Sequence, residues 1–349
     1  MWKFLESEKL VILGLAEDAT RTDAQIADLY NLKKGTVASI RRRLLDSGAI
    51  TFVNVPSFNK LGCEMLAAHI GTAEPTDKTD SRASSYVEFT SKTPQIFHGL
   101  IGGSSVVFYT ALRSATEFDG IIQSHGMFFT GSRRHFKARI SSTVFPFALS
   151  RITMVPNFAP VVYRYFDLEV PPPKPVPASS FEVETPDLTQ TEKKTLVALI
   201  EDPRASDRHV ASLVGVSRQA ITRIRNKLIE ERIVIPACVP RMYKWGFEIA
   251  VIAHPRFNME IPWEKRLKTQ PKESSELSIM TMSKPDEAVA NYMIAKFAEF
   301  SEGLEGTLAW YHKAKAFDEK PEITLFPLER STELRTFEYG PAVRRLLTP

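Results

Sequence analysis

The sequence predicts an α+β fold with two copies of a winged helix-turn-helix followed by a ferredoxin-like βαββαβ domain. Three observations lead to this prediction. The pattern of residues 22–44 returns without a gap at 206–228. Apolar residues in both segments repeat with the helical period on either side of a turn. Each segment is followed by the same order of strand-like and helical stretches. A chain of 349 residues exceeds one ordinary core, so its length suits a tandem duplication.

The second copy has the clearer helix-turn-helix pattern. Its apolar residues are Val210 and Leu213 on a first short helix and Ile221, Ile224 and Leu228 on a second. Gly215 can supply the tight turn between them. Ser217 stands at the N-cap position, where its hydroxyl can accept from the free N–H groups of the next turn. In the first copy Ile26 and Leu29 take the places of Val210 and Leu213.

The outer face of each second helix carries cationic, hydroxyl and amide side chains, as a recognition helix in the major groove of DNA requires. We therefore predict that double-stranded DNA is the partner of these helices. The predicted DNA-binding residues are Lys33, Lys34, Thr36, Ser39, Arg41, Arg42, Arg43, Ser217, Arg218, Gln219, Thr222, Arg223, Arg225, Asn226 and Lys227.

Side-chain chemistry divides this set by role. The amides of Gln219 and Asn226 can pair bidentately with adenine, and Arg42 and Arg218 can pair with guanine. The residues expected to hold phosphates are Arg41, Arg43, Arg225 and Lys227. Because the two recognition helices differ in sequence, we expect an asymmetric DNA site.

Further elements follow in the same order in both copies. In the first, residues 49–55 form a predicted strand, and a strand pair at this place would be a wing. The first ferredoxin-like domain is predicted from 64–72, 83–90, 95–101, 105–112, 117–124 and 139–147, with a hairpin turn at Gly102-Gly103. The second is predicted from 247–254, 262–268, 276–282, 289–295, 300–313 and 322–328. A weaker repeat closes each half, where Pro160-Val161 corresponds to Pro341-Ala342.

These patterns predict five segments. They are a winged helix-turn-helix at 1–58, an effector domain at 59–168, a Pro-rich linker at 169–186, a second winged helix-turn-helix at 187–242 and a second effector domain at 243–349. The prolines from Pro171 to Pro177 suit a stiff extended spacer.

Composition favours a soluble globular protein. The hydrophobic share is 43% and the charged share 25%, and no run of residues approaches the length of a membrane span. A net charge of +4 is too small to indicate nucleic-acid binding by itself. Cys63 and Cys238 have no metal-binding spacing and are expected to be reduced core thiols. We expect a cytoplasmic protein without membrane contact.

No pattern of catalytic residues is recognisable. The seven histidines show no metal-ligand spacing, and the sequence has no phosphate-binding loop and no nucleophile motif. We therefore predict no metal, no cofactor and no catalytic residue, and a protein that is not an enzyme.

A winged helix-turn-helix joined at Lys60-Leu61-Gly62 to a βαββαβ domain resembles the leucine-responsive regulatory protein/AsnC (Lrp/AsnC) family of prokaryotic transcription regulators. Residues 96–103 and 106–109 resemble the effector-domain hairpin of that family. Two features depart from the family pattern. Arg41 and Arg225 replace an apolar residue, and residues 283–286 replace the glycine turn in the second copy.

The resemblance implies that the ferredoxin-like domains pair and present both recognition helices to successive major grooves. The chain is then an intrachain pseudo-dimer, and the effector domains could also form a homodimer. The resemblance also implies a small-molecule effector, for which the candidate residues are His98, Gly102, Gly103 and Ser104. The predicted function is a sequence-specific DNA-binding transcription regulator.

Two other functions suit the same pattern. Siroheme decarboxylases resemble this architecture, occur as paired or fused copies and bind a tetrapyrrole through effector-domain histidines. In such an enzyme His98 and His125 would contact propionates or iron. Winged helices also serve as protein-interaction scaffolds. The cationic recognition helices favour the regulator.

Overall fold

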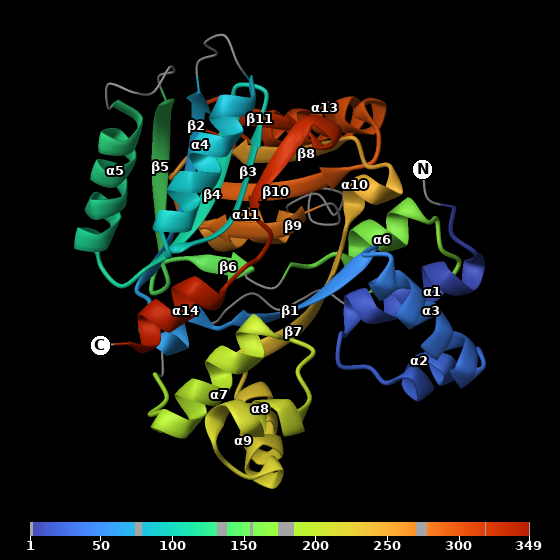
Figure 1. The fold of residues 1–349 in the computed structure, drawn as a ribbon. Helices are drawn as coiled ribbons and strands as arrows, with labels where there is room; N and C mark the ends of the chain where they lie inside the picture. The colour runs from blue at the N-terminus through green and yellow to red at the C-terminus, as the bar shows by residue number, and fades with distance from the viewer. Residues whose placement is uncertain are drawn as a thin grey trace. The chain divides into compact units, whose positions relative to one another are not determined.

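The computed structural model describes residues 3–73, 79–130, 138–153, 156–173, 185–269, 278–317 and 319–348 (Figure 1). The chain divides into two compact units. Unit 1 contains Met1–Val53, Arg151–Ser179 and Pro236–Leu325, and unit 2 contains Asn54–Ser150, Ser180–Ile235 and Phe326–Pro349. Each unit therefore combines segments from both halves of the sequence. The five predicted segments give an order along the chain rather than the outline of these units, and residues 174–184 of the predicted linker lie outside the described residues.

Unit 1 begins with the three helices of the first helix-turn-helix. Its helices are α1 (Glu6–Glu17), α2 (Asp23–Leu29), α3 (Lys34–Asp46), α6 (Ala159–Tyr165), α10 (Met242–Trp245), α11 (Trp263–Thr269) and α13 (Phe297–Lys313). A five-stranded sheet has the order β11-β8-β10-β9-β6. Its strands are β6 (Arg151–Thr153), β8 (Ile249–His254), β9 (Ser278–Ser283), β10 (Ala288–Ile294) and β11 (Glu322–Pro327).

Unit 2 contains the second helix-turn-helix and a sheet in the order β12-β3-β4-β2-β5. The strands are β2 (Met65–Ala73), β3 (Ile96–Gly102), β4 (Ser105–Leu112), β5 (Ala138–Pro146) and β12 (Ser331–Arg335). The helices are α4 (Thr79–Lys92), α5 (Ala115–Thr130), α7 (Gln190–Glu201), α8 (Asp207–Val214), α9 (Arg218–Glu230) and α14 (Gly340–Leu347), with short helices η1 (Phe58–Leu61) and η2 (Leu328–Arg330).

The α+β fold with winged helix-turn-helix and ferredoxin-like parts is confirmed. In unit 2, α4 and α5 pack against the sheet (Figure 1). The apolar core between them includes Tyr86 and Phe89 from α4, Phe129 from α5 and Phe108 from β4. A smaller core in unit 1 contains Ile249, Val251 and Ile294, all buried.

The helix-turn-helix geometry follows the predicted residues closely. Gly215 ends α8 with φ +80°, and Asn31 holds the corresponding turn with φ +51°. Both angles lie in the left-handed region, which Gly and Asn tolerate best. The Ser217 hydroxyl accepts from the Ala220 N–H at 3.2 Å, as an N-cap does.

One predicted apolar face is wrong in part. Val210 is fully buried, but Leu213 is 64% exposed, and Leu29 in the first copy is 53% exposed. Both residues lie near the C-terminal ends of short helices that bury only a narrow stripe. The apolar face of each first helix is therefore shorter than the sequence suggests.

The strand after each recognition helix does not form a wing hairpin within its own copy, which corrects our expectation. Instead β1 (Ile50–Pro56) and β7 (Val234–Pro240) pair with each other as a two-stranded sheet. In unit 1 the Arg241 N–H donates to the Ala49 carbonyl at 2.9 Å, and in unit 2 the Ser57 N–H donates to the Ile233 carbonyl at 2.9 Å. Each unit thus contains one end of this sheet, built from one strand of each half of the sequence.

The segments that close the two halves are elements that sequence patterns did not predict. β6 extends a sheet whose other strands come from the second half, and β12 extends a sheet from the first half. Each is followed by a helix with proline in its first turn, α6 and α14. α6 packs on α1, and α14 packs on α7. The weak repeat at Pro160 and Pro341 therefore corresponds, in each unit, to a helix that packs on the first helix of the helix-turn-helix domain.

Candidate nucleic-acid interface

The outward face of α9 is a polar surface with a shallow hollow of about 710 Å³. Its apolar residues Ile221, Ile224 and Leu228 are buried beneath it. The hollow is lined by Arg218, Gln219, Thr222, Arg223, Asn226, Lys227 and Glu230. Six of the seven residues predicted on this helix therefore share one surface, and Ser217 caps the helix beside it.

Two arginines and two amides of this surface are free to contact a ligand. Arg218, Gln219, Arg223 and Asn226 are exposed, and their side chains make no hydrogen bond or ion pair within the described part of the chain. Thr222 is engaged differently, because its hydroxyl donates to Asp207 at 2.6 Å. The free side chains have the donor and acceptor groups that base edges and phosphates require.

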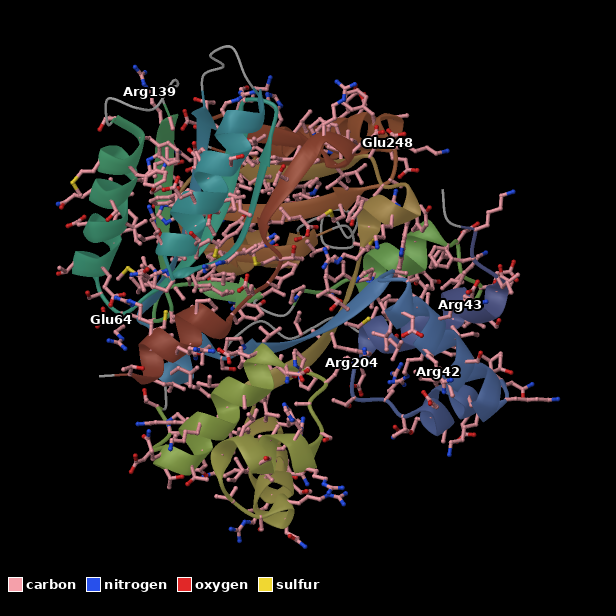
Figure 2. All side chains as sticks on the ribbon, in the orientation of Figure 1. Arg42, Arg43, Glu64, Arg139, Arg204 and Glu248 are labelled. Atoms are coloured by element: carbon pink, nitrogen blue, oxygen red, sulfur yellow. The ribbon has the colours of Figure 1, made fainter. Side chains whose placement is uncertain are left out.

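The corresponding surface of α3 is more cationic and lacks amides. Lys33, Lys34, Thr36, Ser39 and Arg42 are all exposed. No side chain caps the start of α3, where Lys33 occupies the N-cap position. The consecutive residues Arg42 and Arg43 both extend their side chains from α3 (Figure 2). The two recognition helices therefore differ in chemistry as the sequence predicted.

Arg41 and Arg225 have structural partners. The Arg225 Nε lies 2.7 Å from an Asp207 carboxylate oxygen, and the Nη2 of the same guanidinium group donates to the Ala205 carbonyl at 2.7 Å. Arg41 forms the same two contacts, with Asp23 at 2.7 Å and with the Arg21 carbonyl at 2.7 Å. In each copy the arginine ties the recognition helix to the start of the preceding helix. A phosphate-binding role for these two arginines stays a prediction, beside this structural role.

Arg43 and Lys227 form a second pair of matched contacts. Lys227 Nζ lies 2.6 Å from a Glu192 carboxylate oxygen on α7, and Arg43 pairs with Glu8 on α1. Burial raises the pKa of Glu192, but hydrogen bonds from Lys227 and Thr189 outweigh it, so the pKa falls below its usual value. These contacts fix the recognition helix to the first helix of the same domain. Their use as phosphate contacts also stays a prediction.

The predicted effector residues are not brought together. Gly102, Gly103 and Ser104 form the β3–β4 turn, with φ +59° at Gly103. A side chain on Gly102 would collide with the hydroxyl of Ser331. His98 lies four residues back along β3 and is buried, with its Nδ1 donating to the Arg335 carbonyl at 3.0 Å. An effector site at these four residues therefore stays a prediction.

Three histidines of unit 2 are buried rather than poised for chemistry. His69 is fully buried, and its ring nitrogens lie 2.8 Å from the Ser142 hydroxyl and 3.0 Å from the Thr110 hydroxyl. His125 Nε2 lies 3.1 Å from the Tyr86 hydroxyl. Burial lowers the pKa of His69 to about 3 and that of His125 and His98 to about 4. Each ring is therefore neutral near pH 7.

Within the described ranges, no group of three or more His, Cys, Asp or Glu side chains is placed to hold a metal ion. Cys63 and Cys238 are both buried, and burial raises the pKa of each thiol to about 12. No helix in the described part of the chain is long and apolar enough to cross a membrane.

Comparison with known proteins gives one domain match. The family model for winged helix-turn-helix DNA-binding domains matches residues 188–235. This match contains α8 and α9, so unit 2 carries a winged helix-turn-helix domain. No curated protein sequence matches the chain significantly.

Some solved structures resemble nearly the whole chain, and others resemble less than half of it. The siroheme decarboxylase NirDL covers 97% of this chain and 98% of its own, with 12% identity and a TM-score of 0.52. Its co-complex with an iron-uroporphyrin III analogue gives a TM-score of 0.53 at the same coverage and identity. An AsnC family transcriptional regulator from Agrobacterium tumefaciens covers 40% of this chain and 89% of its own, with 12% identity and a TM-score of 0.33.

The likeness to NirDL overturns the prediction that this chain is not an enzyme. That prediction rested on the lack of a recognisable catalytic motif and on the cationic recognition helices, which favoured a regulator. An enzyme has the same fold over 97% of this chain. At 12% identity the likeness establishes the shared fold, and a fold alone does not separate a regulator from an enzyme.

Proposed function

We propose that this protein is a sequence-specific DNA-binding regulator that reads DNA through α9 and α3. The observation that carries the proposal is the exposed face of α9, where Arg218, Gln219, Arg223 and Asn226 are unpaired in the described part of the chain. The neighbouring cations Arg225 and Lys227, in contrast, form ion pairs with Asp207 and Glu192. The surface therefore separates side chains that position the helix from side chains left free for a ligand.

The free groups divide into two kinds of contact. Gln219 and Asn226 lie seven residues apart on the same face of α9, a spacing of two helical turns, and their amides can pair with adenine edges. Arg218 and Arg223 can reach phosphates or guanine. On α3 the exposed groups are cationic or hydroxyl-bearing. The proposal therefore assigns base discrimination mainly to α9, within an asymmetric DNA site.

The test starts from selection of a preferred site by the purified chain from random genomic fragments. Affinity is then measured by fluorescence anisotropy between 50 and 200 mM salt. Arg223→Ala should weaken binding and reduce the salt slope by about 0.9, the contribution of one phosphate contact. The matched control is Arg330→Ala, which removes an exposed arginine outside the helix-turn-helix and should change neither quantity.

Gln219→Ala tests base reading separately from charge. This variant should lose discrimination at one base pair by about 1–3 kcal/mol while its salt slope stays unchanged. A chain that selects no common sequence, or that binds all fragments equally in the parent and in both variants, contradicts the proposal.

A second candidate function is chemistry on a tetrapyrrole, favoured by the full-length fold likeness to the siroheme decarboxylase NirDL. The histidines expected to serve that chemistry do not fit it here. His98 and His125 are 5% and 3% exposed. The ring of His98 stacks on Phe337 at 4.1 Å, and His125 contacts Tyr86. Neither ring has an open face toward a large planar substrate, so any such site would use other residues.

The two functions are separated by adding siroheme to the purified chain. A regulator without this chemistry leaves the absorption spectrum of siroheme unchanged and releases no CO₂. A shifted spectrum with loss of carboxylate groups from the tetrapyrrole, measured by mass spectrometry, would establish the enzyme. The parent chain and the Arg223→Ala variant serve together, because DNA binding by α9 should not affect this readout.

A further inference from the structure

Unit 1 contains a hollow of about 600 Å³ with aromatic walls, between α1, α6 and the end of β10. The Phe4 and Phe166 rings meet edge to face with centroids 5.2 Å apart, and the Tyr165 and Phe247 rings lie 4.6 Å apart. The Tyr165 hydroxyl donates to the carbonyl of the fully buried Trp245 at 2.7 Å. These contacts hold the aromatic walls in place, as a preformed site for a flat apolar group requires.

The rim of the same hollow is positively charged. Lys9, Arg164 and Lys296 line it, and Glu299 is the one acid among the lining residues. Lys9 pairs with Glu6 on its own helix. Arg164 and Lys296 are exposed, and neither side chain has a hydrogen-bond or ion-pair partner within the described ranges. An anion at this rim would therefore gain two uncommitted cations.

Unit 2 has a hollow of about 630 Å³ at the equivalent place. Sequence correspondence identifies its counterparts. At the repeat offset of 184 positions, Phe4 corresponds to Leu188 and Lys9 to Lys193. At the offset of 181 positions, Tyr165 and Phe166 correspond to Leu346 and Leu347. The hollow of unit 2 is thus aliphatic where that of unit 1 is aromatic.

The arginine of unit 2 already has a carboxylate partner. Arg345, the counterpart of Arg164, binds Glu117 with one nitrogen–oxygen distance of 2.8 Å. Glu117 is the third residue of α5, and Glu299 is the third residue of α13. Burial raises the pKa of Glu117, but the hydrogen bonds from Arg345 and Arg113 outweigh it and hold the pKa below its usual value. This arginine position therefore binds a carboxylate in unit 2. In unit 1 the equivalent Glu299 forms no ion pair with Arg164 within the described ranges, so Arg164 has no carboxylate partner there.

A second difference concerns the cations beside the two hollows. In unit 2 the Arg113 guanidinium donates to the carbonyls of Arg345 and Thr348, the latter at 2.8 Å. Strand pairing aligns Met65 with Leu112 and Ile249 with Ile294, so the residues that follow, Arg113 and Ala295, correspond. Unit 1 thus has Ala295 where unit 2 has Arg113, and the next residue, Lys296, brings a cation where unit 2 has Ser114.

We propose that the hollow of unit 1 binds a small aromatic carboxylate. Its ring packs against Phe166 and Tyr165, and its carboxylate accepts from Arg164 and Lys296. In unit 2 the chain's own Glu117 supplies the carboxylate, so the site exists in one copy only. This site is distinct from the β3–β4 turn, and the proposal does not depend on DNA binding.

The test is isothermal titration calorimetry of the full chain with phenylpyruvate and indole-3-acetate, and with neutral indole-3-acetamide for comparison. We expect the two acids to bind with 1:1 stoichiometry and the amide at least tenfold more weakly. Arg164→Gln should weaken binding of the acids at least tenfold, because a charge-assisted hydrogen bond is lost. Lys296→Ser, which introduces the residue of unit 2, should weaken it at least threefold.

Lys193→Gln is the matched control, because it removes the equivalent rim cation of unit 2 and should leave the affinity unchanged. Circular dichroism establishes that each variant is folded; the substituted side chains of Arg164 and Lys296 are exposed in the parent. The proposal is wrong if neither acid binds below 10 mM, if the amide binds as tightly as the acid, or if Arg164→Gln retains the parent affinity. Loss of binding in Lys193→Gln would move the site to unit 2 and equally overturn it.

Discussion

Lowering the pH from 7 to 5 should destabilise unit 2 through three buried histidines, and replacing His125 by glutamine should remove one third of that effect. His69, His98 and His125 are at most 5% exposed. Desolvation lowers the pKa of each to about 4 or below, and for His69 the neighbouring His125 adds a smaller effect. All three are therefore neutral in the folded chain at pH 5.

The magnitude follows from linkage. An unfolded histidine titrates near pH 6.5, so between pH 6.5 and 5 the unfolded chain binds a proton that the folded chain does not. Stability therefore rises with pH across this window and falls on acidification. At about 1.36 kcal/mol per pH unit, each histidine costs about 2 kcal/mol at pH 5, or about 6 kcal/mol for the three together. Carboxyl groups contribute little here, because they titrate mainly below pH 5.

The assay is urea unfolding at pH 7 and at pH 5, followed by circular dichroism. The readout is the difference in unfolding free energy between the two pH values within one protein, so any general cost of a substitution cancels. His125→Gln keeps a hydrogen-bonding group near Tyr86 and should reduce this difference by about 2 kcal/mol. His209→Gln replaces an exposed histidine of the same unit and should leave the difference unchanged. A pH 7-to-5 loss in His125→Gln equal to that of the parent would refute a neutral buried His125.

Two further predictions concern the recognition helix. Arg225→Ala breaks the contacts with Asp207 and the Ala205 carbonyl, so it should lower the melting temperature by several degrees. An unchanged salt slope of DNA binding in this variant would show that the arginine has a structural role. A slope reduced by about 0.9 would show that it contacts a phosphate. Ser217→Ala removes the N-cap bond to Ala220 and should cost about 1 kcal/mol of unfolding free energy, measured by thermal denaturation, whereas Lys33→Ala, at a position without a side-chain cap, should cost less than half of that.

Local residue patterns predicted most elements because the signals are local. A cap such as Ser217 and a left-handed turn such as Gly215 act within one or two turns of a helix. Each strand of the two sheets except β6 and β12 lies near a stretch of strand-like residues between turn residues. The exposed face of α9 could likewise be read from its helical period.

Pairing between distant segments could not be read in this way. The three residues of β6 are too short a segment to show a strand pattern in the sequence, and their pairing with β9 is what makes them a strand. The contacts of Arg225 with Asp207 were also missed, because a cation on a recognition helix suggests a phosphate ligand. A signal was available: Asp23 and Arg41 have the same 18-residue separation as Asp207 and Arg225. A charge pair repeated at a fixed separation in both copies indicates an internal partner.

The composition of the two units has a consequence for synthesis on the ribosome. Residues 1–53 leave the exit tunnel long before residues 236–325, yet unit 1 needs both segments. Unit 2 combines residues 54–150 with α14, which is synthesised after the other helices and strands of both units. Neither unit is complete until most of the chain has been translated, in contrast to the usual order in which N-terminal domains fold first. A premature stop in the second half would therefore leave two unfinished units rather than one intact domain and one missing one.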